Sequence, residues 1–111
     1  MELKHNLELY KLKSEISKAF SDPKRLMIIT ELRDGEKSVG ELAASLETPQ
    51  AVISRQLALL KTKGVVKPRR AGNNIYYSLT DMRICQACDI VHEVLVERLA
   101  RDKSLAEKLL S

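Results

Sequence analysis

The spacing of hydrophobic residues is helical before Gly64 and strand-like after it. This change limits the folds that the chain can adopt. In "TPQAVISRQLALLKTKG" apolar residues recur at helical spacing, with Thr48 as the expected N-cap and Pro49 at the first helical position. After Gly64, "VVKPRR" and "IYYSL" are β-rich runs that flank "AGNN", a turn sequence whose residues tolerate positive φ. Pro68 has no N–H to donate, so its strand is expected at an edge. The segment predicts a helix followed at once by a short two-stranded hairpin.

Three helices are expected before this segment and one long helix after it. Apolar spacing and turn residues predict them at about 7–20, at 23–33, at 39–46, and from after Asp81 to about 100. Ser38 and Glu41 form a capping box for the third helix, and Ser104 with Glu107 predicts a short terminal helix. The first and last helices carry more apolar residues than one small core can bury. This excess favours contact with a partner chain.

Length and composition indicate one water-soluble domain over residues 1–111. Hydrophobic residues make up 44% of the chain and charged residues 31%, a balance typical of globular proteins. There is no apolar run of ~18 residues, as a membrane span would need, and no apolar signal segment near the N-terminus. We therefore expect a cytoplasmic protein without a membrane partner. Two cysteines three positions apart cannot build a disulfide framework.

The positive charge of the chain is concentrated in one segment, residues 48–80. This segment holds six of the 19 Lys and Arg residues and no Asp or Glu. The rest of the chain has 13 basic against 15 acidic residues, so the segment accounts for the whole net charge of +4. A basic stripe confined to one part of a fold favours a polyanionic partner such as nucleic acid.

The order of elements predicts a mainly α fold with a small β-hairpin, a winged helix-turn-helix. Such a motif places its second helix in the major groove of double-stranded DNA. Short polar side chains and a cation near the start of that helix can read base edges, and the hairpin can reach phosphates or the minor groove. The expected DNA-contacting residues are Gln50, Ala51, Ser54, Arg55, Lys61, Lys63, Arg69, Arg70, Asn73 and Asn74.

Four stretches of the chain resemble the ArsR-type (arsenical-repressor) regulators. They are "SDPKRLMIITEL", "SVGELAASL", "TPQAVISRQLALLKTKGVV" and "RRAGNNIYYSLT". The resemblance implies a homodimer that binds an operator and represses transcription until a signal releases it. It places the helix-turn-helix at 38–64, the wing at 65–79, and dimerisation in the first and last helices, at 1–20 and 81–111. It implies no enzymatic activity and no required cofactor.

The resemblance also points to two metal-sensing places used in the family, and this sequence completes neither. Where a cysteine pair would precede the second helix of the motif, the run is "ELAAS", with Ala43 and Ser45 in place of thiols. The other place, on the last helix, uses aspartate, histidine and glutamate ligands. The matching residues here are Asp81, Arg83, Val94 and Glu97. An arginine stands where a histidine would, so a zinc site of that kind is not expected.

The run "RICQACDIVHE" offers a different sensor, because Cys85, Cys88 and His92 fall on one face of the expected last helix. A cysteine pair at i and i+3 lies within reach of a disulfide, which predicts a redox switch. The same thiols, with His92 or across a dimer, could bind zinc, cadmium, copper(I) or arsenite. A third interpretation makes both cysteines small buried residues of a dimer core. Thioredoxin-like chemistry is excluded, because it needs a βαβ setting.

The sequence thus predicts a sequence-specific DNA-binding transcriptional regulator that responds to a thiol-directed signal at Cys85 and Cys88. One alternative keeps the DNA binding and makes the cysteines purely structural. Another, from a different class, is a winged-helix module that binds only proteins. The operator, the inducer and the choice between repression and activation are not readable from these residues.

Overall fold

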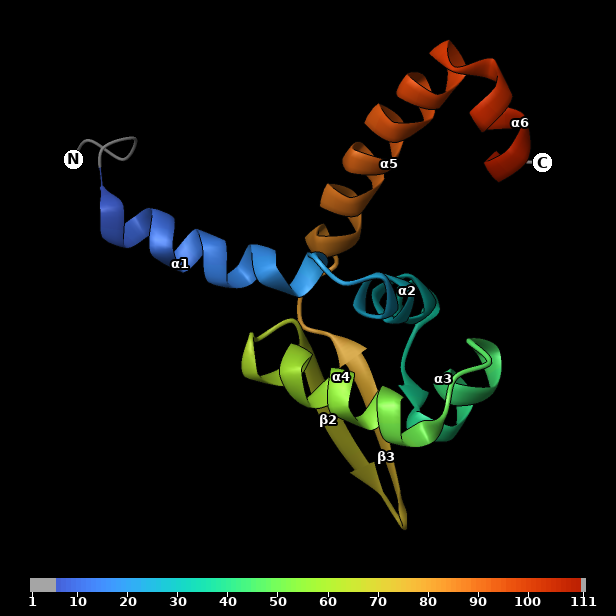
Figure 1. Ribbon diagram of the computed structural model, residues 1–111. Coiled ribbons are helices and arrows are strands. Elements are labelled where there is room, and N and C mark those ends of the chain that lie inside the picture. The colour runs from blue at the N-terminus through green and yellow to red at the C-terminus, as the bar shows by residue number, and fades with distance from the viewer. Residues whose placement is uncertain (1–5, 111) are drawn as a thin grey trace. The chain divides into compact units, whose positions relative to one another are not determined.

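The computed structural model describes residues 6–110, except for the side chains of residues 105 and 106 (Figure 1). The chain divides into two compact units, Met1–Asp81 and Met82–Ser111. The expectation of one domain over 1–111 therefore stays a prediction.

The first unit is built mainly from four helices, two of which end in 3₁₀ turns. They are α1 (Leu7–Ser17) with η2 (Lys18–Phe20), α2 (Pro23–Glu31) with η3 (Leu32–Asp34), α3 (Val39–Ser45) and α4 (Gln50–Thr62). Asn6 caps α1 by accepting a hydrogen bond from the N–H of Leu9, and Asp22 caps α2 in the same way from Arg25. These helices agree closely with those predicted from apolar spacing.

The turn between α3 and α4 differs from the expectation in two details, the N-cap and the place of Pro49, which precedes the first helical residue Gln50. Ser38 and Glu41 form the predicted capping box of α3. Thr48, however, does not cap α4, because Pro49 occupies the N-cap position and no side chain caps this helix. The Thr48 side chain is instead buried, where its hydroxyl donates to the carbonyl of Leu46. The prediction of a Thr48 cap was wrong because this hydroxyl turns back into the loop.

The sheet contains three strands where the sequence predicted two. β2 (Val66–Ala71) and β3 (Asn74–Leu79) form the expected hairpin, and β1 (Lys37–Ser38) pairs with the other edge of β3, which gives the order β1-β3-β2. β2 is an edge strand, as Pro68 required. In the two-residue turn only Gly72 takes a positive φ, +62°, and Asn73 does not.

The core of the first unit lies between the helices and the sheet and fixes the outward face of α4. Ile53, Leu57 and Leu60 of α4 are fully buried, and α4 contacts α2, α3 and β2 (Figure 1). Burial of each such side chain contributes roughly 1.5–3 kcal/mol. Because these residues share one side of the helix, the opposite side must face solvent. Gly64 ends α4 with a φ of +75°, as the change of period predicted.

The second unit consists of α5 (Arg83–Arg101) and α6 (Lys103–Leu110). Both helices were expected, but α6 already includes Ser104, so the predicted capping box at its start was wrong. Four apolar side chains in the middle of α5 are exposed: Ile90, Val91, Val94 and Leu95. Among the described residues, no helix combines the length and apolar character needed to cross a membrane.

Candidate nucleic-acid interface

The solvent-facing side of α4 carries the residues that were predicted to read DNA bases. Gln50, Ala51, Ser54 and Arg55 are all exposed, and they occupy the first two turns of the helix. Lys61 is exposed near its end. Within residues 6–110, the side chains of Arg55 and Lys61 form no ion pair or hydrogen bond. Both charges are therefore available to a ligand.

Two basic residues of α2 hold the other side of α4. Arg25 donates to the side-chain oxygen of Gln56 at 3.0 Å and to the backbone carbonyls of Ala19 and Lys18. The ammonium of Lys24 donates to the Thr48 hydroxyl at 2.7 Å. These bonds tie the turn before α4 and the middle of α4 to α2, and so help to set the angle of its exposed face.

Sequence reasoning missed this supporting role, although a signal was present. The cations Lys24 and Arg25 lie in the first turn of α2, where the positive end of the helix dipole disfavours them. Basic residues in that unfavourable place indicate partners elsewhere in the fold. Here the partners are a hydroxyl, an amide and two carbonyl oxygens.

Three of the predicted DNA contacts on the wing are exposed and not ion-paired among the described residues, whereas the fourth, Arg69, is bound by a carboxylate of the protein. Arg70, Asn73 and Asn74 are exposed, and Arg70 has no side-chain partner among the described residues. Arg69 instead forms a bidentate pair with Glu36, with its Nε 3.0 Å from Oε2, and its guanidinium lies 5.2 Å from the centre of the Tyr76 ring. The hydrogen bond from Arg69 lowers the pKa of the Glu36 carboxyl.

Lys63 is the second predicted DNA contact that the protein itself binds. Its ammonium donates to one oxygen of the Glu15 carboxylate, and Lys18 donates to the other oxygen at 2.9 Å. The hydrogen bond from Lys63, followed by that from Lys18, lowers the pKa of Glu15 from 4.5 to about 2. Lys63 is also only partly exposed. In this structure its charge is turned toward α1.

In the folded chain, acidic residues from outside the basic segment 48–80 offset part of its positive charge. Residues 48–80 contain no acidic residue, yet folding brings Glu15 and Glu36 to two of its six cations. The four cations without a side-chain partner among residues 6–110 are Arg55, Lys61, Lys67 and Arg70. Two of them lie on α4 and two on β2.

The two cysteines lie near the start of α5. Cys85 is buried, Cys88 is partly exposed, and neither forms a disulfide. His92 is exposed one turn further along. Among the described residues, no three His, Cys, Asp or Glu side chains gather closely enough to hold a metal ion. The set Cys85, Cys88 and His92 thus does not form a three-ligand site within one chain, because seven residues of helix separate its ends.

Comparison with known proteins agrees with this geometry. The family model "Bacterial regulatory protein, arsR family" matches residues 22–67. The chain is 38% identical over 89 residues to the uncharacterized HTH-type transcriptional regulator MJ1325 of Methanocaldococcus jannaschii, an alignment that covers 79% of this chain and all of the relative.

Solved structures share the fold. The transcriptional repressor BigR from Xylella fastidiosa superimposes with a TM-score of 0.73 at 31% identity, over 85% of this chain and 96% of that one. The homodimeric winged helix-turn-helix DNA-binding domain of Mb0332 from Mycobacterium bovis gives a TM-score of 0.77 at 27% identity, over 91% and 92% of the two chains. The fold predicted from the sequence is confirmed, and the chain belongs to the ArsR family of winged helix-turn-helix transcriptional regulators.

Proposed function

We propose that this regulator is a homodimeric repressor that binds an operator with α4 in the major groove and β2–β3 against the neighbouring backbone. The observation that carries the proposal is the exposed face of α4. Gln50, Ser54 and Arg55 lie there, on a helix whose opposite face is locked into the core. A rigid helix with short polar side chains and one cation that has no side-chain partner among residues 6–110 fits base recognition.

Three side chains of this face have chemically suited partners in the groove. Arg55 can donate two hydrogen bonds to the O6 and N7 of a guanine, and Gln50 can pair with the N6 and N7 of an adenine. The methyl group of Ala51 suits contact with a thymine methyl. Arg70 and Lys67 supply charge for phosphates, which adds affinity without sequence preference.

Exposed apolar surface on two helices supports the dimer. Leu7 and Leu12 of α1 are 65% and 66% exposed, and Ile90, Val91 and Val94 of α5 are similarly open. Apolar surface of this kind on both helices indicates a protein contact. The similar Mb0332 domain is a homodimer, and BigR is a repressor. A two-fold dimer would present two copies of α4 to two half-sites about 34 Å apart.

Selection from a random pool of duplex DNA tests this function and identifies the operator in the same experiment. The expected product is an inverted repeat whose half-site centres lie about one helical turn apart. Binding to that duplex should exceed binding to shuffled DNA by roughly a thousandfold or more at physiological salt. Recovery of no common sequence, with equal affinity for all duplexes, would instead favour the alternative of a protein-binding winged helix.

We also propose that a thiol-directed signal at Cys85 and Cys88 controls this binding. The cysteines stand at i and i+3 on α5, and Cys88 is accessible enough to react first. In the redox form, a two-electron oxidant such as a peroxide would take two electrons, and the two thiols would lose two protons and form one disulfide. In the metal form, thiolates from both protomers would hold a soft ion such as zinc, cadmium, copper(I) or arsenite.

DNA binding by the wild type and by the double variant Cys85→Ser/Cys88→Ser separates these forms. Each protein is titrated with operator under dithiothreitol, after peroxide, and with each metal ion or arsenite. Loss of wild-type binding after peroxide alone supports the disulfide, and loss with one ion supports the thiolate site. If the two proteins respond alike to every condition, the cysteines are structural and the signal lies elsewhere.

A further inference from the structure

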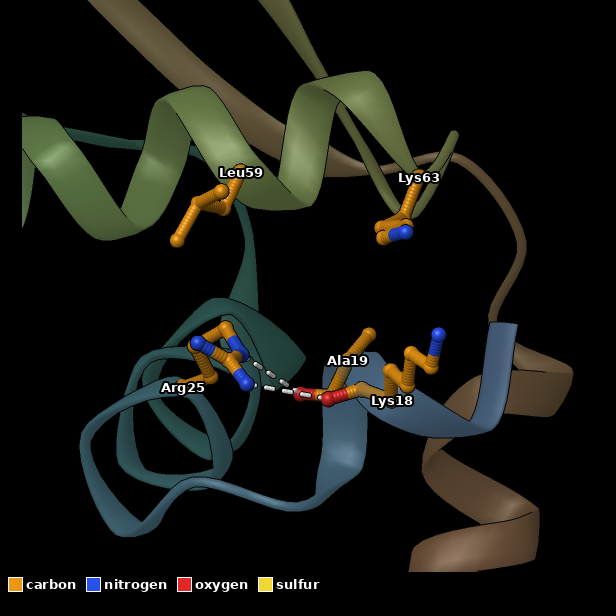
Figure 2. A pocket seen from close by; sticks show the side chains of 5 residues that line it. All are labelled: Lys18, Ala19, Arg25, Leu59 and Lys63. Carbon is orange, nitrogen blue, oxygen red and sulfur yellow. Dashed lines mark hydrogen bonds between the residues drawn. The ribbon is translucent and has the colours of Figure 1, made fainter. Parts of the chain in front are cut away.

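A cavity of about 210 Å³ lies between the C-terminal half of α4 and the segment that joins α1 to α2. Its lining comes from Lys18 and Ala19 of η2, Arg25 of α2, Leu59 of α4, and Lys63, the C-cap residue of α4. Figure 2 shows Leu59 and Lys63 projecting from α4 toward Ala19 and Lys18 on the opposite side. None of these residues belongs to the face of α4 that was assigned to DNA bases.

The lining combines positive charge with an apolar patch. Lys18, Arg25 and Lys63 are cationic, whereas Ala19 and Leu59 are apolar. Leu59 stays 44% exposed although the other leucines of α4 are buried. Arg25 is already committed, since it donates to two backbone carbonyls and to Gln56. It therefore supplies a fixed positive wall, while the two lysines remain able to change partners.

A carboxylate already bridges those two lysines. Glu15 accepts from Lys63 with one oxygen and from Lys18 with the other, at 2.9 Å. The two ammonium groups are thus spaced to hold one carboxylate between them. Glu15 is about half exposed, and its place can be taken by another anion without breaking the core. The intramolecular pair shows which chemical group this corner of the protein accepts.

We propose that the cavity binds a small organic anion, with its carboxylate between Lys18 and Lys63 and a short apolar tail against Ala19 and Leu59. Its volume is below the ~300–1,000 Å³ of pockets for drug-sized ligands, so a short chain fits it. The anion replaces Glu15 as the partner of both lysines. No covalent step is involved.

Binding of the anion would alter a link between two functional helices. The Glu15–Lys63 pair joins α1 to the end of α4. Replacement of Glu15 by a free anion releases α1 from α4, which would change the operator affinity of a dimer built on α1. This regulatory consequence rests on the proposed function, whereas anion binding itself does not.

Calorimetry with hexanoate as the probe tests the site, with neutral hexanamide and inorganic phosphate as comparison compounds. We expect hexanoate to bind the wild type and hexanamide to bind at least tenfold more weakly, because charge-assisted hydrogen bonds are lost. Lys63→Gln should weaken hexanoate binding about tenfold, and Lys61→Gln, an exposed lysine outside the cavity, should leave it unchanged. Phosphate should bind more weakly than hexanoate, because it leaves Leu59 uncovered.

Glu15→Gln gives a test in the opposite direction. It removes the internal competitor for both lysines, so hexanoate should bind several-fold more tightly. Glu8→Gln is the matched control, since Glu8 lies on the same helix and pairs with Lys11 rather than with a lysine of the cavity. Thermal melting of each variant checks that it is folded. Absence of hexanoate binding by a folded Glu15→Gln variant would overturn the proposal, as would equal binding by the Lys63→Gln and Lys61→Gln variants.

A final experiment distinguishes anion binding at the cavity from its proposed effect on operator binding. Hexanoate is titrated into wild-type protein with and without its selected operator. A shift in operator affinity that Lys63→Gln abolishes supports control through the α1–α4 link. Hexanoate binding that leaves operator affinity unchanged overturns the regulatory consequence and keeps the anion site.

Discussion

The exposed face of α4 and the strand β2 both carry cations, but the fold treats them differently. On α4, Arg55 and Lys61 have no side-chain partner among the described residues. On β2, the neighbours Arg69 and Arg70 diverge, because Arg69 is bound to Glu36 and stacked on Tyr76, whereas Arg70 has no such partner in residues 6–110. Adjacent residues of a strand point to opposite faces, which explains the split.

The difference shows that charge along a sequence overstates the charge available to a ligand. Glu36 directly precedes β1, and the pairing of β1 with β3 brings it beside the wing. Each cation held by an internal carboxylate must exchange that partner before it can contact a phosphate. The face of α4 needs no such exchange, so we expect it to dominate affinity and specificity.

The largest effect is expected from Arg55→Ala. Loss of a bidentate base contact should lower operator affinity by roughly ten- to a hundredfold, and affinity for shuffled DNA much less. Fluorescence anisotropy on both duplexes measures the two losses, and Lys61→Ala serves as the control cation on the same helix. Equal losses on operator and shuffled DNA would remove Arg55 from the base-reading set.

A smaller effect, without sequence preference, is expected from Arg70→Ala. This change should weaken operator and shuffled DNA alike and reduce the slope of log affinity against log salt by about 0.9 for each protomer. Arg69→Ala, one residue away, should change both quantities less, because Glu36 already holds that charge. Salt titrations of the two variants measure both slopes. A larger slope change for Arg69→Ala than for Arg70→Ala would mean that Arg69, and not Arg70, contacts the phosphates.

Glu36→Gln should remove the ion pair of Arg69, so that both Arg69 and Arg70 of β2 can contact DNA. It frees Arg69, so affinity for both duplexes should rise modestly and the salt slope should steepen by up to about 0.9 for each protomer. Glu8→Gln removes the same charge far from the wing and controls for net charge. The double variant Glu36→Gln/Arg69→Ala should lose the gain. If it keeps the gain, Glu36 acts through overall charge and not through Arg69.

Local sequence signals were enough to predict most of the fold. The helices followed from apolar spacing and from caps such as Asp22, and the hairpin followed from Gly72 and the β-rich runs beside it. β1 was missed because two residues are too few for a periodic signal, and Ser38 already indicated a helix cap. The Thr48 cap was wrong because its hydroxyl donates to the Leu46 carbonyl and accepts from Lys24, a partner 24 positions away that local signals do not reveal.

The site was predicted less completely, for a related reason. Exposure of Gln50, Ser54 and Arg55 follows from the helical period alone. The internal pairs of Lys63 and Arg69 join residues 48 and 33 positions apart, and the pattern of a single chain carries no trace of such distant pairings. The cavity beside Lys63 likewise depends on three separate elements, so no local motif indicated it.

The smallest expected effect concerns the Glu15 pair and its dependence on pH. Because the two lysines lower the folded-state pKa of Glu15 to about 2, the pair stabilises the fold above the ordinary value of 4.5 and is lost as pH falls toward 2. The stabilisation is modest, since exposed pairs contribute little.

The pH dependence of the Glu15 carboxyl can be followed by NMR, and its titration midpoint should lie near pH 2. Lys63→Gln removes the largest cause of the shift and should raise that midpoint toward 4.5, whereas Lys61→Gln should not move it. A midpoint near 4.5 in the wild type would mean that Glu15 does not join α1 to α4. Arg69 would then be the one cation of residues 48–80 that a carboxylate holds among the described residues.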